Sequence, residues 1–598
     1  MRLHDEADVA EYLRNGWWVP DTWSTLLSAR VAEAPDRLAV LDPGNRAQWL
    51  DGTPQRWTWR ELDEQAGRLV TILYTAGIRA EDIVIVQLPN SVELVATYFA
   101  LSRLGAIASP LPVQYREHEI TQLGSLLGAA ALITATRIGT RRSAERAVAL
   151  RDRLPALGTI FAWGPGAPPT VIELDTARPS AGETAAAAGY CAQRAEHPND
   201  CVTICWTSGT EGTPKAVPRA HGDWIAMAWG NVDGPQLTAA DVLLNPFPMV
   251  NMAGLSGMML AWLLSGSLLV QHHPFDLDTY LRQIEDERVT YTLAPPALLT
   301  RMLHQPEILA RADISSLRIL GSGSAPLSPS LLTGWRDQYG LEIINCFGSN
   351  EGLCLNGDPA IVPDAGDRAR YFPRFGAGGY TWPIRSTRGF RSRLVDAATG
   401  QQIDDAGHPA EIRIKGPNVF AGYWTPTGLD RSGFDDEGFF RTGEIFEISA
   451  VDGDPRYYRY VSRRKDLIVR GGMNISPAEI EGLVAAHPAV AETAVVGYPD
   501  EELGERSCAF VVTRPGASLT LADLTGYLRQ RDVASYKIPE RLEIIDALPR
   551  NPLGKVIKTA LRAAVSGAAV SGAAVSGAAV SGAPAGGTAP AELRPAPA

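Results

Sequence analysis

Cysteine is scarce in this chain, with six residues among 598, and this scarcity excludes a fold held together by disulfide bonds. Cys201 and Cys205 resemble half of a zinc site only at first glance, because no second pair of ligands lies nearby in the sequence. Both belong to the apolar run 201–206, which is typical of a buried strand. We therefore expect buried structural thiols.

Basic residues are also fewer than acidic ones. The chain carries 55 Lys and Arg against 67 Asp and Glu, a net charge of −12. A protein of this balance has no general basic surface for nucleic acid or for acidic lipid, so we expect neither as a partner. An anionic substrate such as ATP must then be held by local donors and a metal ion.

Long apolar runs are missing as well. No uninterrupted run reaches the roughly 20 residues that a membrane span needs. The nearest, 257–270, is broken by small and polar residues and predicts a buried helix followed by a strand. The charged first residues contain no apolar core of a signal peptide, so we expect a cytoplasmic protein.

What the chain does have is a Gly/Ser/Thr-rich stretch at 207–215, directly after the apolar run 201–206. Glycines allow close backbone approach, and consecutive N–H groups, hydroxyls and one ammonium suit a polyphosphate. The spacing is not that of a Walker A loop, and a surface turn is the alternative interpretation. The candidate phosphate-binding residues are Thr207, Ser208, Gly209, Thr210, Thr213 and Lys215.

Strands alternate with helices over the first 200 residues, which predicts α/β subdomains with parallel sheets. The run 82–88 predicts a strand, and Ser91 is a suitable N-cap for a helix that ends near residue 104. We expect the Ala-rich stretch 181–188 to be a surface loop. At 598 residues the chain is too long for one core.

Two further strand ends carry polar chemistry, at 317–327 and at 341–352. Each apolar run enters a turn rich in Gly and Ser, and the second turn also carries Phe347, Asn350 and Glu351. Ligands of open α/β sheets bind beyond the C-terminal ends of the strands. We therefore expect these ends and the 207–215 stretch to build one composite site.

The C-terminal part changes character. Short strands begin at 411, a charged joint follows at 463–466, and repeats of Val-Ser-Gly-Ala-Ala begin at Val565. Such repeats cannot bury a core and predict a flexible, disordered tail. The predicted fold class is α/β: a large N-terminal domain of βαβ sheet subdomains (1–462), a small mobile α+β C-terminal domain (463–564) and the tail (565–598).

Seven motifs in order resemble the adenylate-forming superfamily of AMP-binding enzymes, which includes acyl-CoA synthetases, adenylation domains and luciferases. The resemblance covers about residues 20–562. The motifs lie at 207–215, 321–327, 345–352, 440–444, 463–466, 471–481 and 551–555. Each motif is weak alone, but their order is very specific.

The resemblance implies a two-step reaction with ATP and Mg²⁺. A carboxylate attacks the α-phosphate and releases pyrophosphate, and a thiol, usually that of coenzyme A, then displaces AMP. Charge neutralisation and positioning serve this chemistry better than a protein nucleophile does. The catalytic residues implied are Glu351, which binds the metal, and Lys555, which reaches the carboxylate and the α-phosphate.

The same resemblance assigns the remaining roles. Phe347 stacks on adenine, for which a core aromatic is the alternative interpretation, and Glu444 and Arg463 hold the ribose. Lys465 is the hinge on which the small domain turns between steps, and Gly471 and Gly472 serve the coenzyme A step. Further nucleotide-binding residues are Ser324, Ala325, Pro326, Asn345, Gly348 and Asn350.

Four residues depart from the family pattern. Glu211 and Asn350 replace hydroxyl residues near the phosphates, and Glu444 replaces an Asp. Asn251 replaces a His beside the acyl pocket and the thiol tunnel, which enlarges the pocket and puts an efficient second step in doubt.

The acyl pocket is implied to contain Asn251, Met252 and Gly254, facing Gly321 and Gly323. None of these is charged, so no side chain here pairs with an amine. We expect a bulky apolar acid of a cyclic, aromatic or polycyclic kind rather than an amino acid.

Three functions stay open. The first is a carboxylic acid–CoA ligase, and the second is an adenylating enzyme that passes acyl-AMP to a separate thiol-loading enzyme or carrier protein. The third is a non-catalytic nucleotide-binding protein, which the retention of Glu351 and Lys555 disfavours.

Overall fold

The computed structural model describes residues 1–207, 214–451, 454–470, 473–500, 502–531, 533–551 and 554–566. The chain divides into two compact units. The larger comprises Met1–Leu467 with Ser476–Gly482, and the smaller comprises Ile468–Ile475 with the chain from Leu483 onward. The predicted tail beyond 566, part of the phosphate loop (208–213) and Gly471–Gly472 lie outside the described residues.

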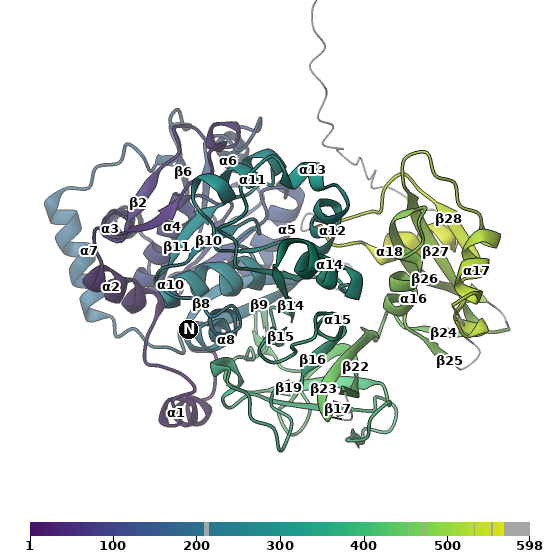
Figure 1. The fold of residues 1–598 in the computed structure, drawn as a ribbon. Helices are drawn as coiled ribbons and strands as arrows, with labels where there is room; N and C mark the ends of the chain where they lie inside the picture. Colours follow the sequence, from purple (N-terminus) through teal and green to yellow (C-terminus); the bar gives the residue numbers. More distant parts are fainter. Residues whose placement is uncertain are drawn as a thin grey trace, which may run out of the picture. The chain divides into compact units, whose positions relative to one another are not determined.

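The first sheet of the larger unit runs in the order β7-β6-β5-β3-β4-β8-β9 among the described residues (Figure 1). Its strands are parallel except for β9, which forms a hairpin with β8. The strands are β3 (Ile83–Val86), β4 (Ile107–Pro110), β5 (Ala131–Ala135), β6 (Thr159–Trp163), β7 (Ile172–Glu173), β8 (Cys201–Thr207) and β9 (Lys215–Ala220).

The second sheet has the order β15-β14-β13-β12-β10-β11-β1-β2. It is parallel except for its two edge strands, β2 and β15. The strands are β1 (Leu38–Leu41), β2 (Arg56–Thr58), β10 (Val242–Asn245), β11 (Leu268–Gln271), β12 (Tyr291–Leu293), β13 (Ile319–Gly323), β14 (Glu342–Gly348) and β15 (Cys354–Gly357).

Alternation along the strands explains how the layers pack. Val84 and Val86 of β3 enter the central core, whereas Ile83 and Ile85 enter the core on the opposite face of the sheet. The central core also contains Leu243 of the second sheet, so helices are buried between the two sheets. Stacked rings of Trp59 and Trp262, 4.6 Å apart, join two of these helices.

The helices of the larger unit fill the connections between strands. They are α1 (Glu6–Arg14), α2 (Trp23–Glu33), α3 (Trp59–Thr75), α4 (Val92–Leu104), α5 (Glu117–Leu127), α6 (Ser143–Val148), α7 (Ala181–Gln193), α8 (His221–Asp233), α9 (Met252–Gly254), α10 (Ala261–Ser265), α11 (Leu277–Asp286), α12 (Pro296–His304), α13 (Pro306–Leu309), α14 (Pro329–Tyr339) and α15 (Ala365–Arg368). Short 3₁₀ turns are η1 (Arg46–Gln48) and η3 (Arg385–Thr387), and η2 (Leu255–Leu260) is a π-helix.

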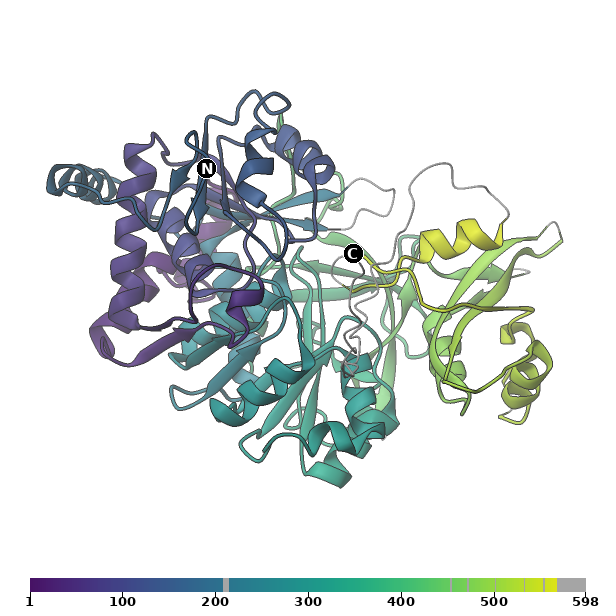
Figure 2. The same ribbon diagram turned by 90° about the horizontal axis from the view of Figure 1, so that it is seen from above.

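The prediction of a loop at 181–188 is wrong, because this stretch begins helix α7, which lies at the outer edge of the larger unit in Figures 1 and 2. Ser180 and Glu183 form a capping box at its start, and alanine has the highest helix propensity. By contrast, Ser91 caps α4 as predicted. The predicted helix and strand at 257–270 are present, with a π-helical first turn.

A third, antiparallel sheet completes the larger unit, in the order β16-β23-β22-β19-β17-β18. Its strands are β16 (Tyr371–Pro373), β17 (Arg391–Val395), β18 (Gln402–Ile403), β19 (Ala410–Lys415), β22 (Phe440–Val451) and β23 (Asp454–Arg463). A separate hairpin consists of β20 (Tyr423–Thr425) and β21 (Gly428–Asp430).

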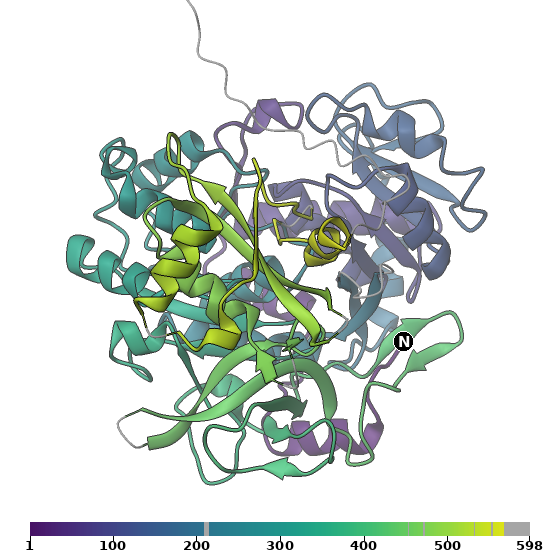
Figure 3. The same cartoon turned by 90° about the vertical axis from the view of Figure 1, so that its right-hand side faces the viewer.

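The smaller unit is an α+β structure, and Figure 3 shows its long strands β26 and β27 side by side. Its strands are β24 (Ile468–Arg470), β25 (Met473–Ile475), β26 (Val490–Asp500), β27 (Gly504–Thr513) and β28 (Arg541–Ile544). Its helical segments are α17 (Leu521–Arg529), η4 (Ser535–Lys537) and α18 (Lys558–Val565), whereas α16 (Pro477–Ala485) contributes to both units.

The predicted fold class, a large α/β part and a small α+β part, is therefore confirmed. Across the described ranges, none of the helices combines the length and the apolar character that crossing a bilayer requires.

Candidate functional site

The phosphate-binding stretch begins at the end of β8 and continues into β9. The register pairs Thr207 with Lys215, so the two ends of the loop are held side by side. Of the candidate residues between them, Ser208, Gly209, Thr210 and Thr213 lie outside the described residues. Lys215 is exposed, and its ammonium lies 4.7 Å from the centre of the Tyr423 ring, a cation–π contact.

The ends of β8 and β14 meet although the two strands belong to different sheets. Asn350, which follows β14, donates from its side-chain amide to the carbonyl of Trp206 in β8 at 3.2 Å. Its amide oxygen accepts from the backbone N–H of Met252 at 2.8 Å. One buried side chain thus joins the phosphate-loop strand, the turn before Glu351 and the predicted acyl pocket.

Glu351 is half-buried and held by contacts from the segment around 420. The hydroxyl of Tyr423 donates to Oε1 of Glu351 at 3.0 Å, and the N–H of Phe420 donates to the Glu351 carbonyl at 2.9 Å. Burial, and then the negative charge of Glu351, raise the pKa of Tyr423, so the phenol stays protonated and remains a donor. Oε2 of Glu351 has no hydrogen-bond partner among the described residues.

Glu444 and Arg463 are brought together by pairing of β22 with β23. Nε of Arg463 donates to Oε1 of Glu444 at 3.0 Å, and the hydroxyl of Tyr460 contacts Oε2 at 3.3 Å. Burial alone lowers the pKa of Arg463, but the negative charges around the guanidinium, of which Glu444 is the strongest, together outweigh burial and raise the pKa. The guanidinium of Arg463 is therefore charged at neutral pH.

Phe347 lies beside this ion pair within an aromatic cluster. Its ring centre lies 5.2 Å from that of Phe446 and 5.1 Å from that of Tyr460, which in turn contacts Glu444. The ring of Phe347 is only partly buried. The structure thus connects the predicted adenine and ribose residues through Tyr460.

The Gly/Ser turn after β13 carries local strain. Ser324 has a φ of 68°, a left-handed conformation that is uncommon for a residue other than glycine, and Ala325 and Pro326 beside it are exposed. Asn345 lies deeper, because its side-chain amide donates to the carbonyls of Arg368 and Ala369 at 2.9 and 3.2 Å. Its amide nitrogen therefore stabilises the protein backbone.

The predicted pocket glycines have a packing explanation. A Cβ on Gly323 would lie 2.1 Å from the Cys346 carbonyl, and one on Gly254 would lie 2.4 Å from the Pro248 carbonyl. A Cβ on Gly321 would lie 2.3 Å from the Leu293 side chain. These glycines are thus required for close approach, and the structure does not show a space beside them.

Asn251 caps α9. Its side-chain oxygen accepts from the N–H groups of Ala253 at 3.0 Å and Gly254 at 3.5 Å. The next residue, Met252, contacts Gly348 at the end of β14, where a Cβ would lie 2.5 Å from the methionine sulfur. The departure at Asn251 therefore has a local structural role.

Lys465 belongs to the larger unit and Lys555 to the smaller one. Lys555 closes a turn in which its N–H donates to the side chain of Asn551 at 2.9 Å and its carbonyl accepts from the Asn551 N–H at 2.8 Å. Gly471 and Gly472 lie outside the described residues.

Comparison with known protein families shows where the chain belongs. The AMP-binding enzyme family matches residues 27–424, and the AMP-binding enzyme C-terminal domain matches residues 479–555.

The chain belongs to the AMP-binding enzyme family.

Full-length relatives agree with this assignment. The chain is 31% identical to 2,3-dihydroxybenzoate-AMP ligase of Bacillus subtilis, over 93% of this chain and 96% of that protein. It is 32% identical to indoleacetate–CoA ligase of Aromatoleum aromaticum, over 90% and 98% of the two chains. The structure of ATP-bound MatB from Rhodopseudomonas palustris matches with a TM-score of 0.71 and 28% identity, over 90% of this chain and 98% of that one.

The predicted resemblance is thus confirmed: this AMP-binding enzyme is an adenylate-forming ligase, its nucleotide is ATP, and its family activates carboxylic acids. The Mg²⁺ that the sequence implies fits Glu351. Tyr423 holds one carboxylate oxygen and leaves the other for a cation, and Mg²⁺ is commonly bound by one or two carboxylates together with substrate phosphates.

Sequence reasoning missed Tyr423 and Arg219. Tyr423 gives no signal, because its partner Glu351 lies 72 positions away. Arg219 does give one, since it is a charged residue in the otherwise buried strand β9, where an unpaired charge is costly.

Proposed function

We propose that this AMP-binding enzyme converts a bulky, apolar carboxylic acid into its acyl-adenylate and then into its coenzyme A thioester. In the first step a carboxylate oxygen bonds to the α-phosphorus of ATP while the bond to pyrophosphate breaks. In the second the thiol sulfur bonds to the acyl carbon, AMP leaves, and the thiol proton passes to solvent.

The residues act in the first step mainly through charge and position. Thr207, Lys215 and the loop between them hold the phosphates, and Phe347 with the Glu444–Arg463 pair holds the nucleoside. Glu351 holds Mg²⁺, which when bound neutralises phosphate charge. Lys555 neutralises the charge that accumulates between the carboxylate and the α-phosphate.

The observation that carries the proposal is the set of contacts around residues 350–351. Asn350 ties the phosphate-loop strand to residues 252–254, which we name the acyl segment, with contacts at 3.2 and 2.8 Å. Tyr423 contacts both Glu351 and the ammonium of Lys215. The groups for phosphate, metal and acid are therefore organised by one short turn, as transfer between two anions requires.

The substrate class rests on chemistry at the acyl segment. Met252, Ala253 and Gly254 carry no charge, and Met252 packs on the end of β14. An amine brought here finds no carboxylate among these residues, and leaving it unpaired is costly. Indoleacetate–CoA ligase, a relative at 32% identity, is named for a cyclic, aromatic acid.

The coenzyme A step is supported by relatives that are CoA ligases. In the proposal Lys465 remains the hinge for the movement between steps, and Gly471 and Gly472 remain the residues of the thiol step. A second candidate is an enzyme that stops at acyl-AMP and hands it to a separate thiol-loading enzyme or carrier protein. Asn251 favours it, because an N-cap amide stands where the family has a His.

Product analysis tests both candidates. The enzyme is incubated with ATP, Mg²⁺ and a panel of aromatic, polycyclic, aliphatic and amino acids, with and without coenzyme A. We expect acyl-CoA and stoichiometric AMP with bulky apolar acids.

Other outcomes would distinguish among the proposed functions. Acyl-AMP that accumulates regardless of coenzyme A supports the adenylation-only enzyme. Preferential activation of an α-amino acid contradicts the substrate class. Absence of pyrophosphate release with every acid, despite ATP binding, indicates a non-catalytic nucleotide-binding protein.

A further inference from the structure

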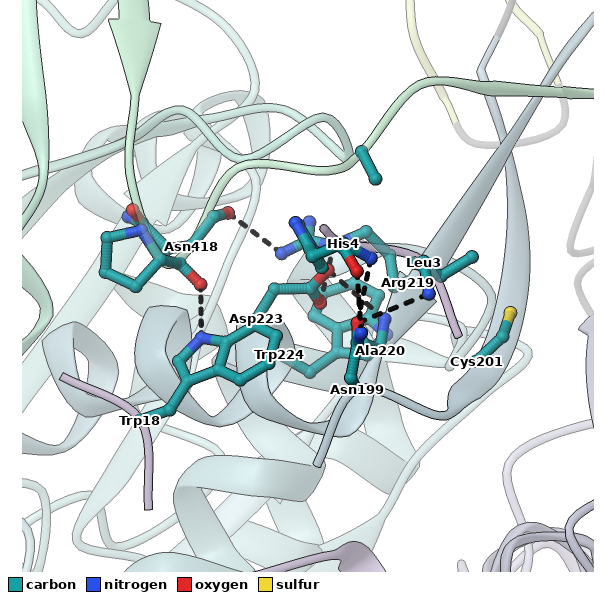
Figure 4. A network of polar contacts seen from close by, with 12 residues as sticks. Leu3, His4, Trp18, Asn199, Cys201, Arg219, Ala220, Asp223, Trp224 and Asn418 are labelled. Atoms are coloured by element: carbon teal, nitrogen blue, oxygen red, sulfur yellow. Dashed lines mark hydrogen bonds and ion pairs between the residues drawn. The ribbon is translucent and has the colours of Figure 1, made fainter. Parts of the chain in front are cut away.

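Strand β9 carries a fully buried arginine. The side chain of Arg219 has 0% exposure and stacks on Trp224 with 4.4 Å between the guanidinium carbon and the ring centre. A guanidinium in such a place is costly unless its N–H groups are satisfied. Arg219 donates to the carboxylate of Asp223 and to the carbonyls of Asn350 and Asn418, part of the network in Figure 4.

The two carbonyls belong to loops that meet at Glu351. Asn350 directly precedes Glu351, and the Glu351 carbonyl is itself bound by the N–H of Phe420. The backbones touch at Gly352, which has a φ of 124° and where a Cβ would lie 2.3 Å from the Asn418 carbonyl. Arg219 therefore holds both loops at the point where the carboxylate of Glu351 is set.

The guanidinium of Arg219 is itself held in place by Asp223 and, through Asp223, by His4. Asp223 is also fully buried, and its second oxygen contacts Nε2 of His4 at 3.2 Å (Figure 4). His4 is anchored through its backbone to the side chain of Asn199 at 2.9 and 2.8 Å. The N-terminal segment thus reaches the network from outside residues 27–424, the part that matches the family.

A second contact from this segment ends on the same loop. Nε1 of Trp18 donates to the carbonyl of Pro417 at 2.7 Å, next to the Asn418 carbonyl that Arg219 binds. Trp18 packs so closely on α8 that a Cβ at Gly222 would lie 2.3 Å from its ring. Two residues of the N-terminal segment therefore brace the loop that carries Asn418.

We infer that Arg219 is a positioning residue for Glu351, and that Asp223 and His4 fix its guanidinium. The inference rests on the proposed role of Glu351 in holding Mg²⁺. Arg219 touches neither substrate nor metal; it fixes the peptide from which the carboxylate projects. A shift of about 1 Å at such a support is enough to impair catalysis strongly.

Arg219→Lys tests this role. Lysine keeps the positive charge beside Asp223, but its single ammonium lacks the planar fork that spans two carbonyls. Isothermal titration calorimetry gives the ATP dissociation constant with and without Mg²⁺. We expect the Mg²⁺-dependent gain in ATP affinity to fall at least fivefold in Arg219→Lys and likewise in Glu351→Gln, with no further fall in the double variant.

Arg368→Lys is the matched control. Arg368 is also fully buried and also binds a carboxylate, that of Glu342, and backbone carbonyls, those of Ile343 and Val362. We expect this variant to lose stability while the ratio of ATP affinities with and without Mg²⁺ stays at the wild-type value. If Arg219→Lys does not fold, His4→Ala, which leaves the Arg219–Asp223 pair intact, replaces it, with a fall of about twofold expected.

The outcomes separate this inference from the proposed function. The measured quantity is the ratio of ATP affinities with and without Mg²⁺. The positioning role alone is overturned if this ratio is that of the wild type in Arg219→Lys, or in its replacement His4→Ala, but is reduced in Glu351→Gln. The positioning role is also overturned if the double variant loses as much ATP affinity in Mg²⁺ as the sum of the losses in Arg219→Lys and Glu351→Gln. A wild-type ratio in Glu351→Gln overturns both the metal-binding role of Glu351 and the inference built on it.

Discussion

Three charged side chains of the proposed nucleotide site are each held by a second side chain among the described residues. Glu351 is held by Tyr423, Glu444 by Arg463, and Lys215 lies on the ring of Tyr423. Such supports matter because a carboxylate or ammonium acts on phosphate only from a fixed position. Tyr423 takes part in two of these contacts, because it touches both Glu351, the proposed metal ligand, and Lys215, the proposed phosphate-binding lysine.

We predict that Tyr423→Phe lowers the rate of pyrophosphate release by about tenfold or more. The ring that faces Lys215 is retained, but the 3.0 Å hydrogen bond to Glu351 is lost, and a hydrogen bond to a charged group contributes about 1.5–3 kcal/mol. The measurement is the initial rate at saturating ATP, Mg²⁺ and acid.

Tyr457→Phe is the control for this prediction. Tyr457 lies in β23 and donates its hydroxyl to the Ile361 carbonyl at 3.1 Å, so it tests the loss of a phenolic hydroxyl elsewhere in the same unit. We expect its rate to match the wild type. Equal rates for Tyr423→Phe and the wild type mean that Glu351 is positioned without the phenol.

At the scale of elements, the proposed acyl segment (252–254) forms the short helix α9, which is followed by the π-helix η2 and the helix α10. π-Helical turns are rare and often mark functional sites. Asn251 begins this series as the N-cap of α9, and Met252 then packs on the end of β14. The cap therefore fixes the direction in which the acyl segment leaves the sheet.

We predict that Asn251→Ala raises KM for the acid more than KM for ATP and lowers the free energy of unfolding by about 1 kcal/mol, the usual value of an N-cap. Asn251→Ser, which supplies another capping oxygen, should restore both quantities. Steady-state kinetics and thermal unfolding provide the measurement. An unchanged KM for the acid in Asn251→Ala contradicts a link between this cap and the pocket.

The helices and strands also show how much of the structure can be predicted from the sequence. Apolar runs predicted the buried strands, and the structure places Phe347 and Glu351 at the end of one of them, as predicted. The sequence failed at 181–188, where small residues suggested a loop although Ser180 and Glu183 cap a helix. It also missed the bond from Tyr423 to Glu351, because local patterns carry no information on partners distant in the chain.

At the scale of the whole molecule, the proposed catalytic groups are divided between the two compact units. Glu351, Glu444 and Arg463 belong to the larger, and Lys555 belongs to the smaller. Domains joined by a short connection move relative to each other by default, and hinge motion is a common way to change an active site between steps. This division lets one half-reaction be tested without the other.

We predict that Lys555→Ala lowers the rate of acyl-adenylate formation at least 100-fold while the fold stays intact. The turn that presents Lys555 is made by its backbone and by Asn551, with bonds of 2.9 and 2.8 Å, so truncating the lysine side chain leaves these bonds in place. Adenylation is measured by ATP–pyrophosphate exchange, and Lys537→Ala, in η4 of the same unit, controls for the loss of one positive charge.

The second half-reaction is measured separately by giving Lys555→Ala chemically prepared acyl-adenylate and coenzyme A, which bypass the first step. If thioester forms at the wild-type rate from this mixture, Lys555 serves the first half-reaction alone, and equal losses in both steps contradict the division of labour between the two units.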